Sequence, residues 1–85
     1  MHILVEVVDY FDGERSVQLC GTYEDYEDAQ RVMYTLYKDE LASDNEYDED
    51  YCHINSNFAT CGGEDWFPRV MSWYLFDSDN PKVIW

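Results

Sequence analysis

The sequence predicts an α+β domain with elements in the order β-β-α-β-β, in which an antiparallel sheet carries one helix on one face. Two observations support this prediction. Residues 3–22 look like two strands around an Asp12-Gly13 turn, and residues 25–42 carry apolar side chains at helical spacing. Two further apolar runs follow the helix. The 85 residues are enough for one domain over 1–85 and too few for two.

The first predicted element is a hairpin over residues 3–22. Residues 3–11 are rich in β-branched and aromatic side chains, and Asp12-Gly13 favours a tight turn because glycine accepts a positive φ. Strand alternation places one apolar set on a common face of the sheet. The set consists of Ile3, Val5, Val7, Val17 and Leu19. The opposite face is not cleanly polar, and it carries Leu4, Glu6, Val8 and Tyr10.

Residues 25–42 are predicted to form a helix. Asp25 is a favourable N-cap, and Asp28 three residues later is a short variant of the capping box. The apolar residues at helical spacing are expected to pack on the sheet. They are Ala29, Val32, Met33, Leu36 and Leu41. The residues expected to point outward are Arg31, Tyr34, Thr35 and Lys38.

The C-terminal half is predicted to complete the sheet. Residues 51–60 are expected to form a third strand, with Ile54 and Phe58 pointing inward. Residues 67–77 form a fourth strand that is apolar on both faces, and residues 83–85 add a short edge strand. An open antiparallel sheet usually alternates more strictly. We therefore expect the face away from the helix to be covered by the tail or by a second chain.

The charge balance restricts the choice of partners. The chain has 19 acidic and 5 basic residues and a net charge of −14. Direct binding to nucleic acid or to an anionic membrane is disfavoured, because both need clustered Lys and Arg. No stretch approaches the roughly 20 apolar residues that would cross a bilayer. The expected partner is a basic protein.

Cysteine usage predicts a compartment. The chain has 3 cysteines, an odd number, and Met1 leads directly into a strand-like run without a leader-like segment. These features favour a cytoplasmic protein with reduced thiols.

The cysteine and histidine positions do not predict catalysis or zinc binding. Cys52 and His53 are neighbours, but consecutive side chains of a strand point to opposite faces, so they do not form a dyad. Together with Cys20 and Cys61 they could supply four zinc ligands, yet no knuckle spacing occurs. The sequence therefore predicts a protein that is not an enzyme and has no metal or cofactor.

A calcium loop is the second metal alternative. Asp44, Glu46, Asp48 and Asp50 alternate as the start of an EF-hand loop does. The match then fails, because Glu49 occupies the position of the turn glycine and Asn55 that of the final glutamate. No dedicated calcium site is predicted.

The acidic stretch "ASDNEYDEDYCHIN" (42–55) is either a solvated loop that aids solubility or an acidic docking surface. Carboxylates at the helix start suit the positive end of the helix dipole, but Asp39 and Glu40 lie near its negative end, where they cost helix stability. This placement favours a role outside folding. The predicted partner-binding residues are Glu24, Glu27, Asp39, Glu40, Asp44, Glu46, Asp48, Glu49 and Asp50.

Two functional hypotheses follow. In size and charge the chain resembles phage-encoded nucleic-acid mimics, including anti-CRISPR and other anti-defence inhibitors, which implies an inhibitor acting on a nucleic-acid-binding protein in the host cytoplasm. No motif carries this resemblance. The alternative is a self-associating accessory or structural protein, a homodimer through an aromatic sheet face, with the charge serving solubility. The aromatic residues behind this alternative are Trp66, Phe67, Trp73, Tyr74 and Phe76.

Overall fold

The computed structural model describes residues 1–43, 47–63 and 69–77. It confirms the predicted α+β class, with one helix on one antiparallel sheet. The elements are β1 (His2–Tyr10), β2 (Arg15–Tyr23), α1 (Tyr26–Ser43), the 3-10 helix η1 (Glu49–Tyr51), β3 (His53–Ile54), β4 (Phe58–Cys61) and β5 (Arg69–Asp77). The predicted strand over 83–85 lies outside the described residues.

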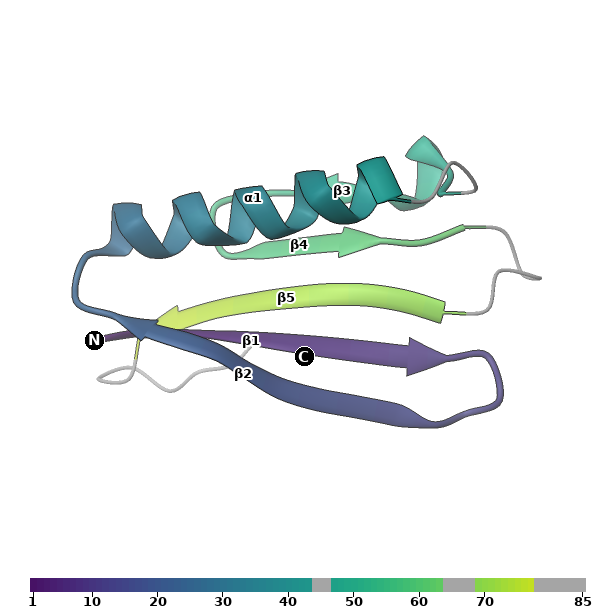
Figure 1. The fold of residues 1–85 in the computed structure, drawn as a ribbon, viewed down its shortest axis with the longest axis horizontal. Coiled ribbons are helices and arrows are strands. Elements are labelled where there is room, and N and C mark those ends of the chain that lie inside the picture. Colours follow the sequence, from purple (N-terminus) through teal and green to yellow (C-terminus); the bar gives the residue numbers. More distant parts are fainter. Residues whose placement is uncertain (44–46, 64–68, 78–85) are drawn as a thin grey trace.

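The strands form one sheet in the order β2-β1-β5-β4-β3, and every neighbouring pair is antiparallel. Helix α1 packs against the sheet and lies towards the β3–β4 side, whereas β2 forms the opposite edge (Figure 1). The β1–β2 hairpin therefore extends beyond the strip of sheet that the helix covers.

The β1–β2 hairpin follows the sequence prediction. Gly13 adopts a φ of +94°, and the Asp12 carboxylate accepts a hydrogen bond from the Glu14 N–H at 3.1 Å. The register pairs Val5 with Leu19 and Val7 with Val17, so these side chains share a face as predicted. A bulge interrupts the ladder further along, because Leu4 pairs with Gly21 while Val5 pairs with Leu19.

Helix α1 begins where the capping argument places it. Asp25 Oδ1 accepts a hydrogen bond from the Glu27 N–H at 3.1 Å. Ala29 and Met33 are buried, and the predicted outward residues are all exposed. Tyr37, one turn after Met33, is also buried although its spacing was not used in the prediction. Val32, Leu36 and Leu41 are only partly buried and pack at the margin of the core.

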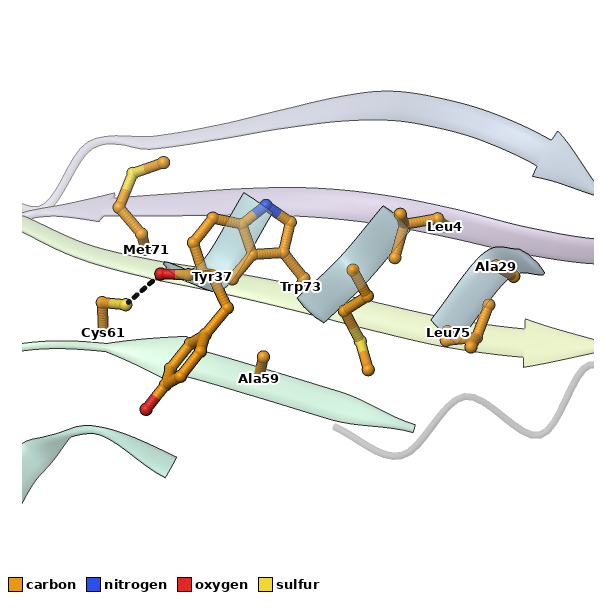
Figure 2. Close-up of a cluster of buried hydrophobic side chains, with 9 residues drawn as sticks. Leu4, Ala29, Tyr37, Ala59, Cys61, Met71, Trp73 and Leu75 are labelled. Atoms are coloured by element: carbon orange, nitrogen blue, oxygen red, sulfur yellow. Dashed lines mark hydrogen bonds between the residues drawn. The ribbon is translucent and has the colours of Figure 1, made fainter. Parts of the chain in front are cut away.

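The core lies between α1 and one face of β1, β5 and β4 (Figure 2). Trp73 is the largest fully buried side chain, at 1% exposure, and the Tyr37 ring meets it edge-on with ring centroids 6.5 Å apart. The buried cluster consists of Leu4, Ala29, Met33, Tyr37, Ala59, Cys61, Met71, Trp73 and Leu75. The helix thus covers the face of β1 that carries Leu4, and the Val5–Val7 face is the opposite one.

The prediction of one strand over residues 51–60 is wrong. The chain reverses at residues 55–57, where the Asn55 side chain accepts a hydrogen bond from the Asn57 N–H at 2.9 Å. Two short strands, β3 and β4, result. Ile54 pairs with Ala59 on the helix side but is 37% exposed, and Phe58 pairs with Tyr74 on the other face. Ile54 and Phe58 therefore do not both point inward, because the turn places them on opposite faces.

Neither helical segment among the described residues combines the length and the apolarity needed to cross a bilayer.

Candidate functional site

The structure places the described members of the predicted docking surface at the two ends of α1. Glu24 and Glu27 are exposed at its start, and Asp39 is exposed in its last turns. Asp50 is exposed in η1, which follows the helix C-terminus in the chain. Of the remaining predicted residues, Asp44 and Glu46 lie outside the described residues, and Glu49 is described only through its backbone in η1.

The carboxylates at the start of α1 have a physical reason to be there. Asp25 caps the helix, and Asp28 forms an ion pair with Arg31 at 3.0 Å. Glu24 and Glu27 are close to the positive end of the helix dipole, which stabilises negative charge within the first turn. The helix can therefore form with this negative charge at its start, and neither Glu24 nor Glu27 needs an ion pair.

Glu40 differs from its neighbour Asp39, because it contacts other parts of the fold. Its side chain is 18% exposed, lies 4.0 Å from the Arg69 guanidinium at the start of β5, and lies 2.8 Å from the Ser43 hydroxyl. These contacts partly explain a carboxylate at the negative end of the helix dipole. Asp39 is exposed and makes no such contact among the described residues, so its cost to the helix has no local compensation.

Asp48 anchors part of the acidic stretch. Its N–H donates to the carbonyl of Gly62 at 3.0 Å, and its Oδ1 accepts a hydrogen bond from the Asp50 N–H at 3.0 Å. The side chain thus caps η1, and the backbone ties η1 to the end of β4. These two hydrogen bonds hold η1 against the sheet. They also fix the backbone of Asp50, whose carboxylate is exposed.

Most of the positive charge that the structure describes is already engaged. Arg15 pairs with Asp9 at 2.6 Å, a contact that raises the pKa of the Arg15 guanidinium. Arg31 and Arg69 pair with carboxylates of α1, and the Lys38 ammonium lies 5.4 Å from the centroid of the Tyr34 ring. Among the described residues, four exposed carboxylates of the predicted docking surface are left without an ion pair. They are Glu24, Glu27, Asp39 and Asp50.

A shallow groove lies between α1 and the β3–β4 turn. The Gln30 side chain donates to the carbonyl of Ser56 at 3.0 Å, and this contact fixes the turn beside the helix. The groove encloses about 470 Å³ and brings the Glu27 carboxylate together with the half-exposed side chains of Tyr34 and Ile54. Sequence reasoning missed it, because its two walls are far apart in the chain.

The four residues considered as zinc ligands do not come together. Cys20 lies on β2, which is separated from β4 and its Cys61 by β1 and β5. Burial raises the pKa of the Cys61 thiol to about 12, with the neighbouring Cys52 as the next cause. Within residues 1–43, 47–63 and 69–77, no three His, Cys, Asp or Glu side chains are grouped as metal ligands.

The aromatic residues divide between the two faces of the sheet. Trp73 is buried under the helix, so it does not offer the exposed hot spot that the alternative hypothesis considered. Tyr74 and Phe58 lie on the other face with ring centroids 5.0 Å apart. Trp66 and Phe67 lie outside the described residues.

Comparison with known protein families, with curated proteins and with solved structures finds no match to this chain.

Proposed function

We propose that this protein is a non-enzymatic inhibitor that occupies the nucleic-acid-binding surface of a basic protein. The observation that carries the proposal is the pattern of exposed carboxylates without ion pairs. Glu24 and Glu27 lie at the N-terminal end of α1. Asp39 lies near its C-terminal end, and Asp50 lies in η1, which follows that end in the chain. A basic surface that contacts this side of the molecule meets negative charge at two separated positions.

The separation of the two acidic ends suits imitation of a nucleic acid. Helix α1 has 18 residues, so it is about 27 Å long at ~1.5 Å per residue. That length corresponds to roughly eight phosphate spacings along one strand of a duplex, at ~3.4 Å each. Because the helix is packed on the sheet, the two ends are held at a fixed distance, and little ordering is needed on binding.

The groove beside α1 adds a contact suited to arginine. A guanidinium can form an ion pair with Glu27 on the groove wall and pack against the half-exposed Tyr34 ring, one face of which the Lys38 ammonium already approaches. Arginine is frequent on nucleic-acid-binding surfaces because it contacts phosphates and base edges. The groove therefore supports the same class of partner as the exposed carboxylates.

Size and charge support a biological setting for this activity. An inhibitor of 85 residues with a net charge of −14 fits the class of phage-encoded anti-defence proteins, which includes anti-CRISPR proteins. In that setting the chain acts in the host cytoplasm on a protein that binds nucleic acid.

A self-associating accessory protein is the second candidate function. It is favoured by two exposed apolar side chains on the face of the sheet that α1 does not cover, Val17 at 62% and Leu19 at 59% exposure. The net charge opposes it, because two copies repel each other. Ionic strength separates the candidates, since an apolar dimer persists in salt whereas a charge-driven complex weakens.

The test begins with affinity capture from a bacterial lysate and identification of the bound protein by mass spectrometry. Competition with duplex DNA for that partner follows. The double variant Glu24→Gln with Asp39→Asn removes one charge from each end of α1. We expect it to bind more slowly than the parent, with a shallower salt dependence.

The matched control is Glu6→Gln with Asp9→Asn. It removes the same two charges and keeps an oxygen acceptor for each present partner, Trp73 and Arg15. Equal loss of binding in both variants would show that net charge alone matters. A captured partner that still binds DNA while in complex with this protein contradicts the proposal.

A further inference from the structure

Strand β2 is an edge of the sheet. Within the described residues it pairs with β1 on one side only, and the opposite edge, β3, has just 2 residues against 9 in β2. Figure 1 shows β2 on the side of the sheet away from α1. A long edge strand presents backbone N–H and C=O groups that can pair with another extended chain.

The first half of β2 has little of the usual protection of an edge. Residues 15–19 are all exposed, and they contain no Pro and only one charged side chain, Arg15, which is paired with Asp9. The bulge lies after these residues, between Leu19 and Gly21. The Tyr23 side chain packs closely on Gly21, because a Cβ added at Gly21 would lie 2.7 Å from the Tyr23 hydroxyl. The Tyr23 side chain therefore lies over the second half of the strand, whereas residues 15–19 remain open.

The exposed side chains of this open half are apolar on one face. Val17 is 62% and Leu19 59% exposed, and both share the face of the sheet that α1 does not cover. Residues two apart on a strand point the same way, so an added strand can place its own apolar side chains beside them.

The charge around β2 restricts what can pair with it. Its nine residues contain no Asp or Glu, in a chain that has 19. Arg15, its one charged residue, is paired with Asp9. Acidic residues stand at both ends, with Asp12 and Glu14 before the strand and Glu24 directly after it. The result is an edge about 30 Å long, at ~3.3 Å per residue, that carries no acidic residue and lies between two acidic ends.

A second copy of the chain is a poor occupant of this edge. Pairing two β2 strands would bring together two molecules of net charge −14. In an antiparallel pair centred on β2, the Asp12–Glu14 end of each copy would approach the Glu24 end of the other. Like charges at such short range oppose association.

We propose that the outer edge of β2 binds an extended segment of a basic partner by strand addition. The segment places apolar side chains at alternate positions beside Val17 and Leu19, and carries Lys or Arg at its ends, next to Asp12, Glu14 and Glu24. Backbone hydrogen bonds supply much of the affinity, and the apolar and basic positions supply selectivity. This surface shares Glu24 with the acidic start of α1 but includes neither the groove nor the C-terminal end of the helix, and the inference does not rest on the function proposed above.

The probe is a fluorescently labelled synthetic peptide, KRTVTVTVKR, whose binding is followed by anisotropy and by the backbone amide NMR signals of the protein. We expect the largest shifts at residues 15–19, together with slower hydrogen exchange there. A peptide of the same charge with proline in place of its central valine cannot continue the ladder, so it should bind at least about tenfold more weakly.

The variant Val17→Thr with Leu19→Thr keeps the charge and the β-propensity but removes apolar contact, and it should weaken binding of the parent peptide about tenfold. The control Val70→Thr alters an exposed residue of the same face on the inner strand β5, and it should bind like the parent protein. The proposal is overturned if both peptides bind alike, or if the shifts map to the carboxylates of α1. Absence of peptide binding also overturns the proposal. So does a dimer of the parent protein in sedimentation that the Val17→Thr, Leu19→Thr variant abolishes, because β2 would then bind a second copy of the chain.

Discussion

Trp73 and Glu6 face each other across the β1–β5 pair, and the indole Nε1 donates a hydrogen bond to Glu6 Oε1 at 3.1 Å. The ring itself is 1% exposed. A glutamate in the sheet thus supplies the acceptor for the one polar atom of the largest core side chain.

This contact predicts different effects for two substitutions of Glu6. Glu6→Ala leaves the buried indole N–H without its acceptor and should lower the free energy of unfolding by about 1–3 kcal/mol. Glu6→Gln keeps an oxygen at the same place and should cost clearly less. Urea denaturation of both variants measures the difference. Equal losses from alanine and glutamine would show that the hydrogen bond does not stabilise the fold.

The helix register gives a second prediction. Met33 is 1% exposed in the core, so Met33→Ala should lower the free energy of unfolding by about 2–5 kcal/mol. Tyr34, the next residue, is 49% exposed, and Tyr34→Ala should cost less than about 1 kcal/mol. Leu36→Ala should fall between them, because Leu36 is only partly buried. Thermal or urea unfolding of the three variants would contradict this register if Tyr34→Ala were the most damaging.

Stability at alkaline pH gives a third prediction. Burial raises the pKa of the Cys61 thiol from 9.0 to about 12, and burial with the nearby Glu40 raises the pKa of the Tyr47 phenol from 10.0 to about 12. The folded state therefore holds these protons at pH values where the unfolded chain releases them. The stabilisation is complete below about pH 9 and is lost as the pH rises towards about 12.

Urea unfolding between about pH 8 and about pH 11 measures this loss. In Cys61→Ala the free energy of unfolding should fall less steeply with pH than in the parent, although the variant starts from a lower value. Tyr47→Phe should reduce the slope in the same way. Curves that run parallel to the parent would mean that neither group holds its proton more firmly in the folded state.

The contacts of Glu40 predict that the acidic residues of α1 are not equivalent for folding. Glu40→Ala removes the contacts to Arg69 and Ser43 and should lower the free energy of unfolding by about 0.5–2 kcal/mol. Asp39→Asn should leave stability unchanged or slightly raised, because it removes a negative charge near the negative end of the helix dipole. Denaturation at low and high salt checks both. A stabilised Glu40→Ala would show that its charge costs more than its contacts contribute.

Local signals in the sequence were sufficient for the hairpin and the helix. The Asp12-Gly13 turn and the Asp25 cap each depend on residues a few positions apart, and both are present in the structure. The same kind of signal was available at residues 55–57, where Asn-Ser-Asn favours a turn, but the apolar residues on either side suggested one continuous strand. Tyr37 was missed although it lies four residues after Met33, because tyrosine is as often exposed as buried.

The candidate site was less predictable, because exposure and pairing depend on chain segments that are distant in sequence. Charge alone indicated the two acidic ends of α1. It did not indicate that Glu40 lies beside Arg69, or that Glu27 and Ile54 line one groove. Those contacts exist only once the sheet brings β3 and β5 beneath the helix. The edge position of β2 likewise follows from the strand order, which the sequence pattern did not specify.

The pairing of β1 with β5 joins the first and last described strands. During synthesis on the ribosome, the β1–β2 hairpin and then α1 can form while the rest of the chain is still being made. Trp73 and Leu75 of β5 complete the core, so the apolar side of β1, with Leu4, remains without its neighbour until β5, the last of the described strands, has been made. Closing so long a loop adds little to the entropic cost, which grows only with the logarithm of loop length, but it slows folding. Until then the nascent chain exposes a strand edge and an apolar surface, which are the features that molecular chaperones bind.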